Sequence, residues 1–265
     1  MIRGFDDKLR ILLLTRTGRP SGEKILKGLI KANKLCVGVV AERRSSMLLR
    51  SGFAAFLLES IRRHGFIFVI TRAIEMLLSQ TKAERNFLEE FCEKNKIPFF
   101  LVDNHNSEST RDILINCRPD VLITANTRII SPELIKIPAK AALNFHTSKL
   151  PQYAGLDSIF WALYHGEKEI GVSIHYLEEG LDTGDIVTQE TIPIKSDDSV
   201  ESLTKKAHDL GARLAVMAIE KFENADFGGI PQDISQRTYF SWPTPTQRKK
   251  LRRMMRQGIH GQRTT

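Results

Sequence analysis

The fold of this chain is decided by residues 9–41, which read LRILLLTRTGRPSGEKILKGLIKANKLCVGVVA. Two apolar runs, residues 9–15 and 35–41, flank a glycine- and proline-containing turn and a segment with apolar residues at helical spacing, residues 22–33. This order predicts a strand, a helix and a second strand. Such units build parallel sheets, so the sequence indicates an α/β protein.

The same alternation continues further along the chain. Helical spacing recurs in residues 84–95 and 107–117, and short apolar runs recur in residues 98–103, 119–124 and 141–145. We therefore predict a Rossmann-like, mostly parallel twisted sheet with helices on both faces.

The pattern changes after residue 170. Residues 171–176 and 186–194 read as strands joined by a short loop, and strands connected so closely should be antiparallel. Apolar residues then recur at three- and four-residue steps over 200–222, which predicts a long helix. The residues expected to cap its start are Ser196, Asp197 and Asp198.

The composition is that of an ordinary soluble protein, with 42% hydrophobic and 26% charged residues in 265. Its three cysteines, Cys36, Cys92 and Cys117, form no C-x-x-C pair, so we expect core residues in a reducing compartment. The N-terminus carries Asp6 and Asp7 and does not resemble a secretory signal. No segment has the roughly 20 apolar residues of a transmembrane helix, and we expect a cytoplasmic protein.

Residues 46–82 interrupt the alternation with an apolar stretch punctuated by arginines. This stretch predicts one or two amphipathic helices packed on the sheet, with a membrane-surface or partner-binding element as the alternative. We accordingly predict a catalytic domain over residues 1–225 that contains this helical insertion, followed by a basic extension over residues 226–265.

The net charge of +8 is unevenly placed, because residues 246–265 contain seven basic side chains and no acid. They are Arg248, Lys249, Lys250, Arg252, Arg253, Arg256 and Arg263. Such a segment can contact a nucleic acid, an anionic surface or a phosphorylated substrate. The alternative interpretation is a solvated, frayed terminus.

A candidate site lies at the end of the predicted strand over residues 141–145. Asn144 and His146 are two positions apart there, so their side chains should share a face. In open α/β sheets, ligands bind in the crevice beyond the carboxyl ends of the strands. An amide and an imidazole are therefore expected to point together into that crevice.

A loop bracketed by Gly180 and Gly184 carries Asp182, and Asp185 follows as a rival. Glycines permit turns that could bring the Asp182 carboxylate against the imidazole. In acyl transfer to an amine, the amine loses a proton and the tetrahedral intermediate needs hydrogen-bond donors for its oxyanion. An amide, an imidazole and a carboxylate suit this chemistry, although Asp182 could also be a simple turn residue.

Four segments together resemble the folate-dependent formyltransferase family. They are LNFHTSKLPQYAG at 143–155, FWALYHG at 160–166, GVSIH at 171–175 and GLDTGDI at 180–186. The family includes glycinamide ribonucleotide transformylase, methionyl-tRNA formyltransferase and the sugar N-formyltransferases. The segments occur in the family's order and spacing.

The resemblance implies that Asn144, His146 and Asp182 are the catalytic residues and that 10-formyltetrahydrofolate is the formyl-donor cosubstrate. The positions that match its pterin-binding segments are Arg128, Ile129, Ile130, Glu178, Glu179, Gly180 and Leu181. The positions that match supporting or substrate-contacting residues are Ser148, Tyr153 and His175. For His175, the alternative is a hydrogen-bonded strand residue without a chemical role. No metal site is expected.

The acceptor side departs from the family's pattern. Thr147, Lys149 and Ala154 replace the proline, leucine and arginine that are usual at those positions. The loop TRTGRPSG at 15–22 lacks the Gly-Ser-Asn-type phosphate cradle of the glycinamide ribonucleotide enzymes. A phosphate could still bind at the helix N-terminus through Arg16, Gly18, Arg19, Ser21 and Gly22.

The residues after the long helix are too few for the β-rich C-terminal domain of the tRNA enzymes. By elimination, we expect a small-molecule amine as the acceptor, namely a nucleotide-linked amino sugar. The alternatives are an aminoacyl-tRNA or another amine as acceptor, and a 10-formyltetrahydrofolate hydrolase. Such hydrolases carry an N-terminal regulatory domain, for which the first strand near residue 9 leaves no room. A non-enzymatic adaptor that uses residues 46–82 and the basic tail is a further alternative. The sequence does not indicate the oligomeric state.

Overall fold

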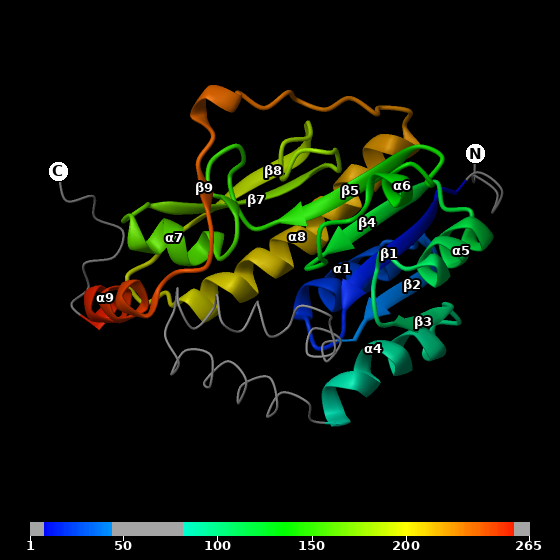
Figure 1. The fold of residues 1–265 in the computed structure, drawn as a ribbon, viewed down its shortest axis with the longest axis horizontal. Coiled ribbons are helices and arrows are strands. Elements are labelled where there is room, and N and C mark those ends of the chain that lie inside the picture. The colour runs from blue at the N-terminus through cyan, green and yellow to red at the C-terminus, as the bar shows by residue number, and fades with distance from the viewer. Residues whose placement is uncertain (1–7, 44–81, 257–265) are drawn as a thin grey trace.

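The computed structural model describes residues 8–43 and 82–256 of the chain (Figure 1). The predicted insertion over residues 46–82 lies outside them except for its last residue, as does the end of the basic tail beyond Arg256. Within the described residues, no helix is both long and apolar enough to cross a membrane.

In the described part of the chain, seven strands form one sheet in the order β3-β2-β1-β4-β5-β7-β8. Their bounds are β1 Arg10–Arg16, β2 Leu35–Glu42, β3 Phe99–Val102, β4 Val121–Ala125, β5 Ala141–His146, β7 Glu169–Tyr176 and β8 Ile186–Pro193. The five strands from β3 to β5 are parallel, and β7 is antiparallel to both β5 and β8. The predicted Rossmann-like, mostly parallel sheet and its antiparallel end are confirmed.

Helices cover both faces of this sheet, because successive side chains of a strand point to opposite sides. In β1, Ile11 and Leu13 pack into one core cluster and Leu12 and Leu14 into the other. The first cluster includes residues of α1 (Pro20–Lys31), α4 (Lys82–Lys94), α7 (Ser158–Tyr164) and α8 (Val200–Glu223). The second includes residues of α5 (Glu108–Cys117) and α6 (Pro132–Ile135).

The long helix α8 begins at Val200, where the apolar spacing predicted it, but its cap is not one of the predicted residues Ser196, Asp197 and Asp198. Its N-cap is Ser199, which forms a reciprocal capping box with Ser202, whereas Asp198 binds the ammonium of Lys206. The helix passes beneath β5, where a Cβ atom on Gly211 would lie only 2.0 Å from the Phe145 ring. The absence of a side chain at Gly211 thus allows close packing of α8 against the strand that carries Asn144 and His146.

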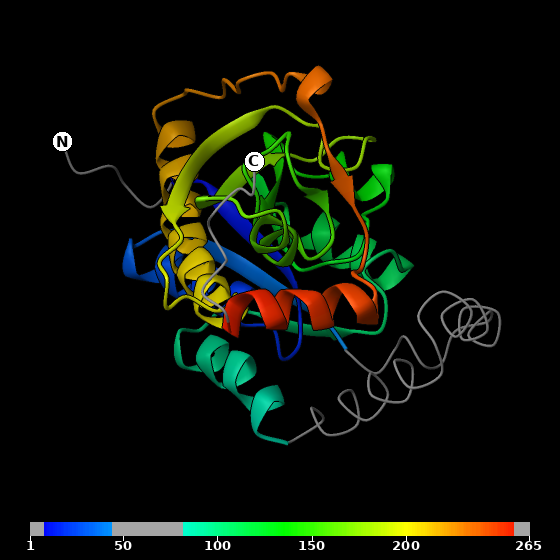
Figure 2. The ribbon, with the colours of Figure 1, turned by 90° about the vertical axis from the view of Figure 1, so that its left-hand side faces the viewer.

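The chain after α8 returns across the molecule instead of ending there. It runs through a short 3-10 helix, η3 (Ile234–Gln236), and β9 (Tyr239–Phe240), and then enters α9 (Pro245–Arg256). In Figure 2 this orange segment descends from η3 through β9 into the red helix α9. Strand β9 pairs in parallel with β6 (Ala154–Gly155), which follows the Asn-x-His strand.

The interpretation of residues 246–265 as a frayed terminus is wrong for the part that the structure describes. Residues 246–256 belong to helix α9, whose Leu251 is only 2% exposed and joins the main core. Arg248 in this helix donates to Asp157 Oδ2 over 2.8 Å. The predicted domain boundary between residues 225 and 226 stays a prediction.

The cysteines behave largely as the sequence indicates. All three are free thiols; Cys36 and Cys92 are buried in the core, while Cys117 is half-buried. Burial raises the pKa of Cys36 to about 12 and that of Cys92 to about 11. Both core thiols are therefore protonated and poorly reactive at neutral pH.

Candidate active site

Asn144 lies near the carboxyl end of β5, between two partners on neighbouring strands. The pairing register places Thr124 of β4 on one side of it and His175 of β7 on the other. Thr124 Oγ1 donates to Asn144 Oδ1 over 2.8 Å, and Asn144 Nδ2 lies 3.1 Å from His175 Nε2. The side-chain amide is thus held at both ends by the sheet itself.

The state of His175 decides which way this amide points. Its Nδ1 lies 2.8 Å from the carbonyl oxygen of Tyr176, and a carbonyl can only accept a hydrogen bond. The proton of the neutral ring is therefore on Nδ1, and Nε2 accepts from Asn144 Nδ2. Burial and the nearby His146 hold the pKa of His175 well below its usual value, although Asp182 acts in the opposite direction.

We expect the His175 imidazole to stay neutral through the physiological pH range. An NMR titration of its ring protons should show no midpoint at or above the ordinary pKa of 6.5. Because the pKa of His175 is lower in the folded protein than in the unfolded chain, protonation of this ring favours unfolding. The free energy of unfolding should therefore decrease as pH falls from 6.5 through the folded-state pKa of His175. A midpoint at 6.5 or higher would contradict the assigned tautomer network.

Asp182 lies in the loop between β7 and β8 and reaches back to β5. Its Oδ2 accepts from the backbone N–H of Gly155 over 2.9 Å, and the residue is only 9% exposed. Its Oδ1 lies 3.8 Å from His146 Nδ1 and also 3.8 Å from His175 Nε2. Asp182 therefore faces both imidazoles, whereas the main-chain carbonyl of Asp185 accepts from Tyr176 N.

His146 completes the group at the last position of β5. Its Nε2 lies 3.4 Å from the carbonyl oxygen of Tyr153, and its Nδ1 faces the Asp182 carboxylate. Both neighbours are hydrogen-bond acceptors, so the ring can donate through either nitrogen. The ring of His146 meets the ring of His175 edge to face, with centroids 6.4 Å apart.

These side chains provide the chemical groups that acyl transfer to an amine requires. Asn144 and His146 are donors that can face a developing oxyanion, and Asp182 is an acceptor for a proton. Asn144 and His146 come from β5, and Asp182 comes from the β7–β8 loop, 36 positions after His146. The structure thus brings together the three residues expected to be catalytic.

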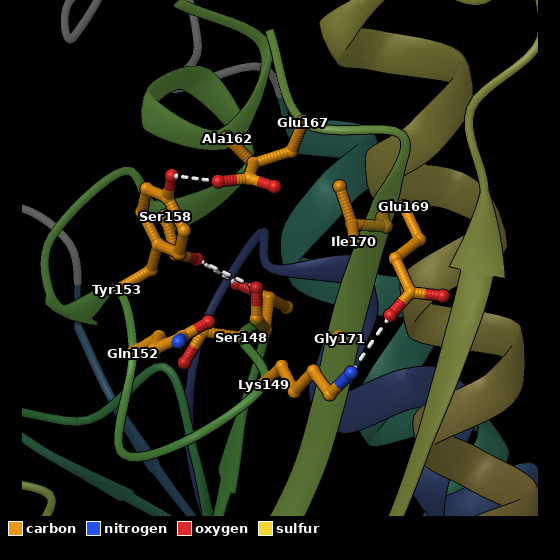
Figure 3. Close-up of a pocket in the computed structure, with 11 residues that line it drawn as sticks. Ser148, Lys149, Gln152, Tyr153, Ser158, Ala162, Glu167, Glu169, Ile170 and Gly171 are labelled. Atoms are coloured by element: carbon orange, nitrogen blue, oxygen red, sulfur yellow. Dashed lines mark hydrogen bonds and ion pairs between the residues drawn. The ribbon is translucent and has the colours of Figure 1, made fainter. Parts of the chain in front are cut away.

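Two of the predicted supporting residues, Ser148 and Tyr153, line a separate small cavity of about 100 Å³ beside α7 (Figure 3). Asn144, His146 and Asp182 do not line it. The Tyr153 hydroxyl donates to Glu167 over 2.8 Å. Ser148 is buried, and its Oγ has no hydrogen-bond partner among the described residues. The role of these two residues in substrate binding stays a prediction.

The segments predicted to contact the pterin differ in how they present their side chains. Arg128 donates two hydrogen bonds of 2.6 Å to the Glu42 carboxylate, so its guanidinium is already paired. Ile129 is 73% exposed, while Ile130 is buried in the second core cluster. Residues 178–181 are all exposed.

Glu42, at the end of β2, is the centre of a buried charge cluster. Its carboxylate is 1% exposed and also lies 3.5 Å from Arg16 Nε and 3.3 Å from His105 Nδ1. Burial alone would raise the pKa of Glu42, but the hydrogen bonds from Arg128 and the His105 backbone and the nearby charges keep it below its usual value. Arg16 of the predicted phosphate loop therefore faces Glu42, and Ser21 Oγ of that loop accepts from Asn126 Nδ2 over 2.6 Å.

Several residues that build the site were missed by the sequence reasoning. Thr124 and Gly155 contact Asn144 and Asp182 directly. A signal existed for Thr124, since it is the one polar residue of β4, a buried strand parallel to the Asn-x-His strand. No local pattern marks Gln232, which donates to the carbonyl of Asp182 from 50 positions away.

A model of the family described as Formyl transferase matches residues 53–219, more than half of the chain. This chain belongs to the formyl transferase family. The resemblance inferred from the four sequence segments is thereby confirmed.

Comparison with another member shows how much of its length this chain shares. It is 38% identical over 149 residues to methionyl-tRNA formyltransferase from Halalkalibacterium halodurans, which covers 56% of this chain and 47% of that protein. The chain therefore spans about half the length of this curated relative. The residues matched by the family model, 53–219, include Asn144, His146 and Asp182.

Solved structures share the fold at low sequence identity. HypX from Aquifex aeolicus superposes with a TM-score of 0.60 and 15% identity over 91% of this chain and 32% of that chain. The sugar 3N-formyl transferase WlaRD, solved in the presence of dTDP and 5-N-formyl-THF, superposes with a TM-score of 0.56 and 17% identity over 88% of this chain and 69% of that chain. These likenesses confirm the formyl transferase architecture.

Proposed function

We propose that this chain is an N-formyltransferase that moves a formyl group from 10-formyltetrahydrofolate to a primary amine. The observation that carries the proposal is the convergence of Asn144, His146 and Asp182 in a chain of the formyl transferase family. Two donors and one proton acceptor on adjacent elements match the needs of a tetrahedral acyl-transfer intermediate.

In the proposed step, the amine nitrogen bonds to the formyl carbon and the bond from that carbon to N10 of the folate breaks. Asn144 and His146 donate to the formyl oxygen while it carries negative charge. One Nδ2 hydrogen of Asn144 is used by His175 Nε2, which leaves the second for the oxyanion. Asp182 accepts the proton that the amine loses, and that proton finally resides on the departing N10.

For the donor, we propose that the pterin lies against the backbone of residues 128–130 and the loop of residues 178–182. The paired guanidinium of Arg128 supports a structural role for that side chain and a backbone role for the segment. The exposed loop of residues 178–181 leads directly into the buried Asp182. WlaRD was solved with a formyl-folate present, which is compatible with the same class of donor here.

For the acceptor, we propose the amino group of a nucleotide-linked amino sugar. The likeness to the sugar 3N-formyl transferase over 88% of this chain supports it. The second candidate is the amino group of an aminoacyl-tRNA, favoured by the 38% identity to a methionyl-tRNA formyltransferase and by the basic helix α9. In α9, Lys249, Lys250 and Arg252 are exposed and could face a phosphate backbone.

The test incubates the protein with 10-formyltetrahydrofolate and, in separate reactions, nucleotide-linked amino sugars, methionyl-tRNA and buffer alone. Mass spectrometry should detect the gain of one CO on an amino sugar. Formylation of methionyl-tRNA alone would establish the second candidate. Release of formate in buffer at the same rate as with any amine would show a hydrolase and contradict the proposed transfer.

A further inference from the structure

The segment that follows α8, residues 226–244, crosses both loops that meet at the site; we call it the strap. Figure 1 shows it in orange, passing over the sheet and down beside α7. In the predicted domain division the strap belongs to a C-terminal extension. Several of its hydrogen bonds, however, go to the two loops that carry Asp182 and Gly155.

On the first loop, the strap holds the backbone at Asp182 through Gln232. The Nε2 of Gln232 donates to the carbonyl of Asp182 over 3.0 Å and to the carbonyl of Gly184 over 2.7 Å. The amide must present its nitrogen here, because the opposite orientation would set three oxygens against one another. Arg237 adds a third contact, since its Nη2 donates to the carbonyl of Leu181 over 2.9 Å.

On the second loop, the strap holds the backbone on both sides of Gly155. Tyr153 N donates to Thr238 Oγ1 over 2.8 Å, and Ala154 N donates to the carbonyl of Thr238 over 2.9 Å. Leu156 N donates to the carbonyl of Phe240 over 2.8 Å. Gly155 itself is left to donate to Asp182 Oδ2.

Both ends of the Gly155–Asp182 hydrogen bond are therefore held by one segment. Both residues also have left-handed backbone angles, with φ of +94° at Gly155 and +54° at Asp182. A non-glycine residue in this region needs support from its surroundings. Gln232 provides such support on the Asp182 side, because one amide group bonds the carbonyls on either side of the turn.

We propose that the strap positions Asp182 against His146 and that Gln232 is the positioning residue of this arrangement. The inference rests on the proposed formyl transfer for its kinetic readout. It assigns the positioning of Asp182 to the strap residues that bond the two loops, and no strap residue is expected to touch the reacting atoms. Removing the two donors of Gln232 should let the Asp182 loop move and should lower kcat more than it changes KM.

The sharpest variant is Gln232→Glu, which keeps the shape of the side chain but places a carboxylate against two carbonyl oxygens. At pH 8 we expect kcat to fall at least about tenfold, since small displacements of a catalytic group cost that much or more. As pH falls, the new carboxyl group gains a proton and with it a donor, and burial among oxygens favours the protonated form. The ratio of variant to wild-type kcat should therefore rise from pH 8 to pH 5.5.

The matched control is Gln236→Glu, which adds the same charge to the same segment. Gln236 is exposed, and its amide binds only the neighbouring Asp233 over 2.8 Å among the contacts described. We expect its kcat to stay within about twofold of wild type at every pH. Gln232→Ala serves as a second variant, because it removes the donors without adding charge and should show the loss of kcat without its pH dependence.

Hydrogen–deuterium exchange separates this inference from the proposed function. In Gln232→Glu and Gln232→Ala, the amide of Gly155, which donates to Asp182 Oδ2, should exchange at least about tenfold faster, with the sheet unchanged. Unchanged exchange of this amide in both variants, or a loss of kcat that is flat with pH in Gln232→Glu, would overturn the positioning role. If wild type transfers no formyl group but the Gly155 amide exchanges faster in the variants, the proposed function fails and the strap's role stands.

Discussion

Replacing Asn144 with alanine is expected to lower kcat for formyl transfer by about 10²- to 10³-fold, the loss typical of removing one oxyanion donor. Asn144 is held at 2.8 Å from Thr124 and 3.1 Å from His175, so its free Nδ2 hydrogen is already aimed when the oxyanion forms. Because that charge develops only in the transition state, KM for both substrates should change little. Initial rates over both substrate concentrations measure the two effects separately.

The control for this loss is Asn224→Ala, the same exchange at the exposed residue that ends α8. It should leave kcat within about twofold of wild type. Circular dichroism and thermal unfolding of Asn144→Ala should show a folded protein, since the sheet around β5 is held by its backbone. A folded Asn144→Ala enzyme with wild-type kcat would remove Asn144 from the proposed mechanism.

The second large effect is expected on stability, at the buried charge cluster. Replacing Glu42 with glutamine removes the carboxylate that neutralises Arg128 and faces Arg16. An uncompensated buried charge costs about 3–5 kcal/mol. The free energy of unfolding, measured by urea titration at pH 7, should fall by that amount, and Tm should fall by roughly 10 °C.

The surface pair Arg43–Asp103 provides the control, with side chains 50% and 72% exposed. Asp103→Asn should change the free energy of unfolding by less than about 1 kcal/mol. The pKa of Glu42 in the folded protein lies below its usual value. The stabilisation that the ionised Glu42 carboxylate provides is therefore present at neutral pH and is lost as pH falls through that pKa. The difference in the free energy of unfolding between wild type and Glu42→Gln should therefore become smaller in acid. Equal free energies of unfolding at pH 7 would contradict the role of the cluster.

Local patterns were sufficient to predict most of the fold. The strand–helix–strand unit over residues 9–41 and the apolar runs after it became the parallel part of the sheet, because buried strands carry nearly continuous apolar residues. The helix cap was misplaced to Ser196–Asp198, since serine and aspartate are good caps at any of these positions and Ser199 follows directly.

The candidate site was predictable only in part. The two-residue spacing of Asn144 and His146 indicates a shared face, while the approach of Asp182 depends on a loop that spacing cannot place. The interpretation of the tail as a frayed terminus was wrong because the basic residues concealed an apolar residue that packs. Leu251 lies in the core, while its charged neighbours face solvent. Contacts such as that from Gln232 join residues 50 positions apart and leave no periodic signal.

The position of the strap in the chain has a consequence for how the protein is made. Every strand of the seven-stranded sheet precedes residue 194, so the ribosome releases all of them before residues 226–244. The nascent sheet can therefore pair its strands while the loops around Asp182 and Gly155 still lack their shared brace. If the strap positions Asp182 as proposed, catalytic competence is acquired late in translation, after the scaffold that carries it.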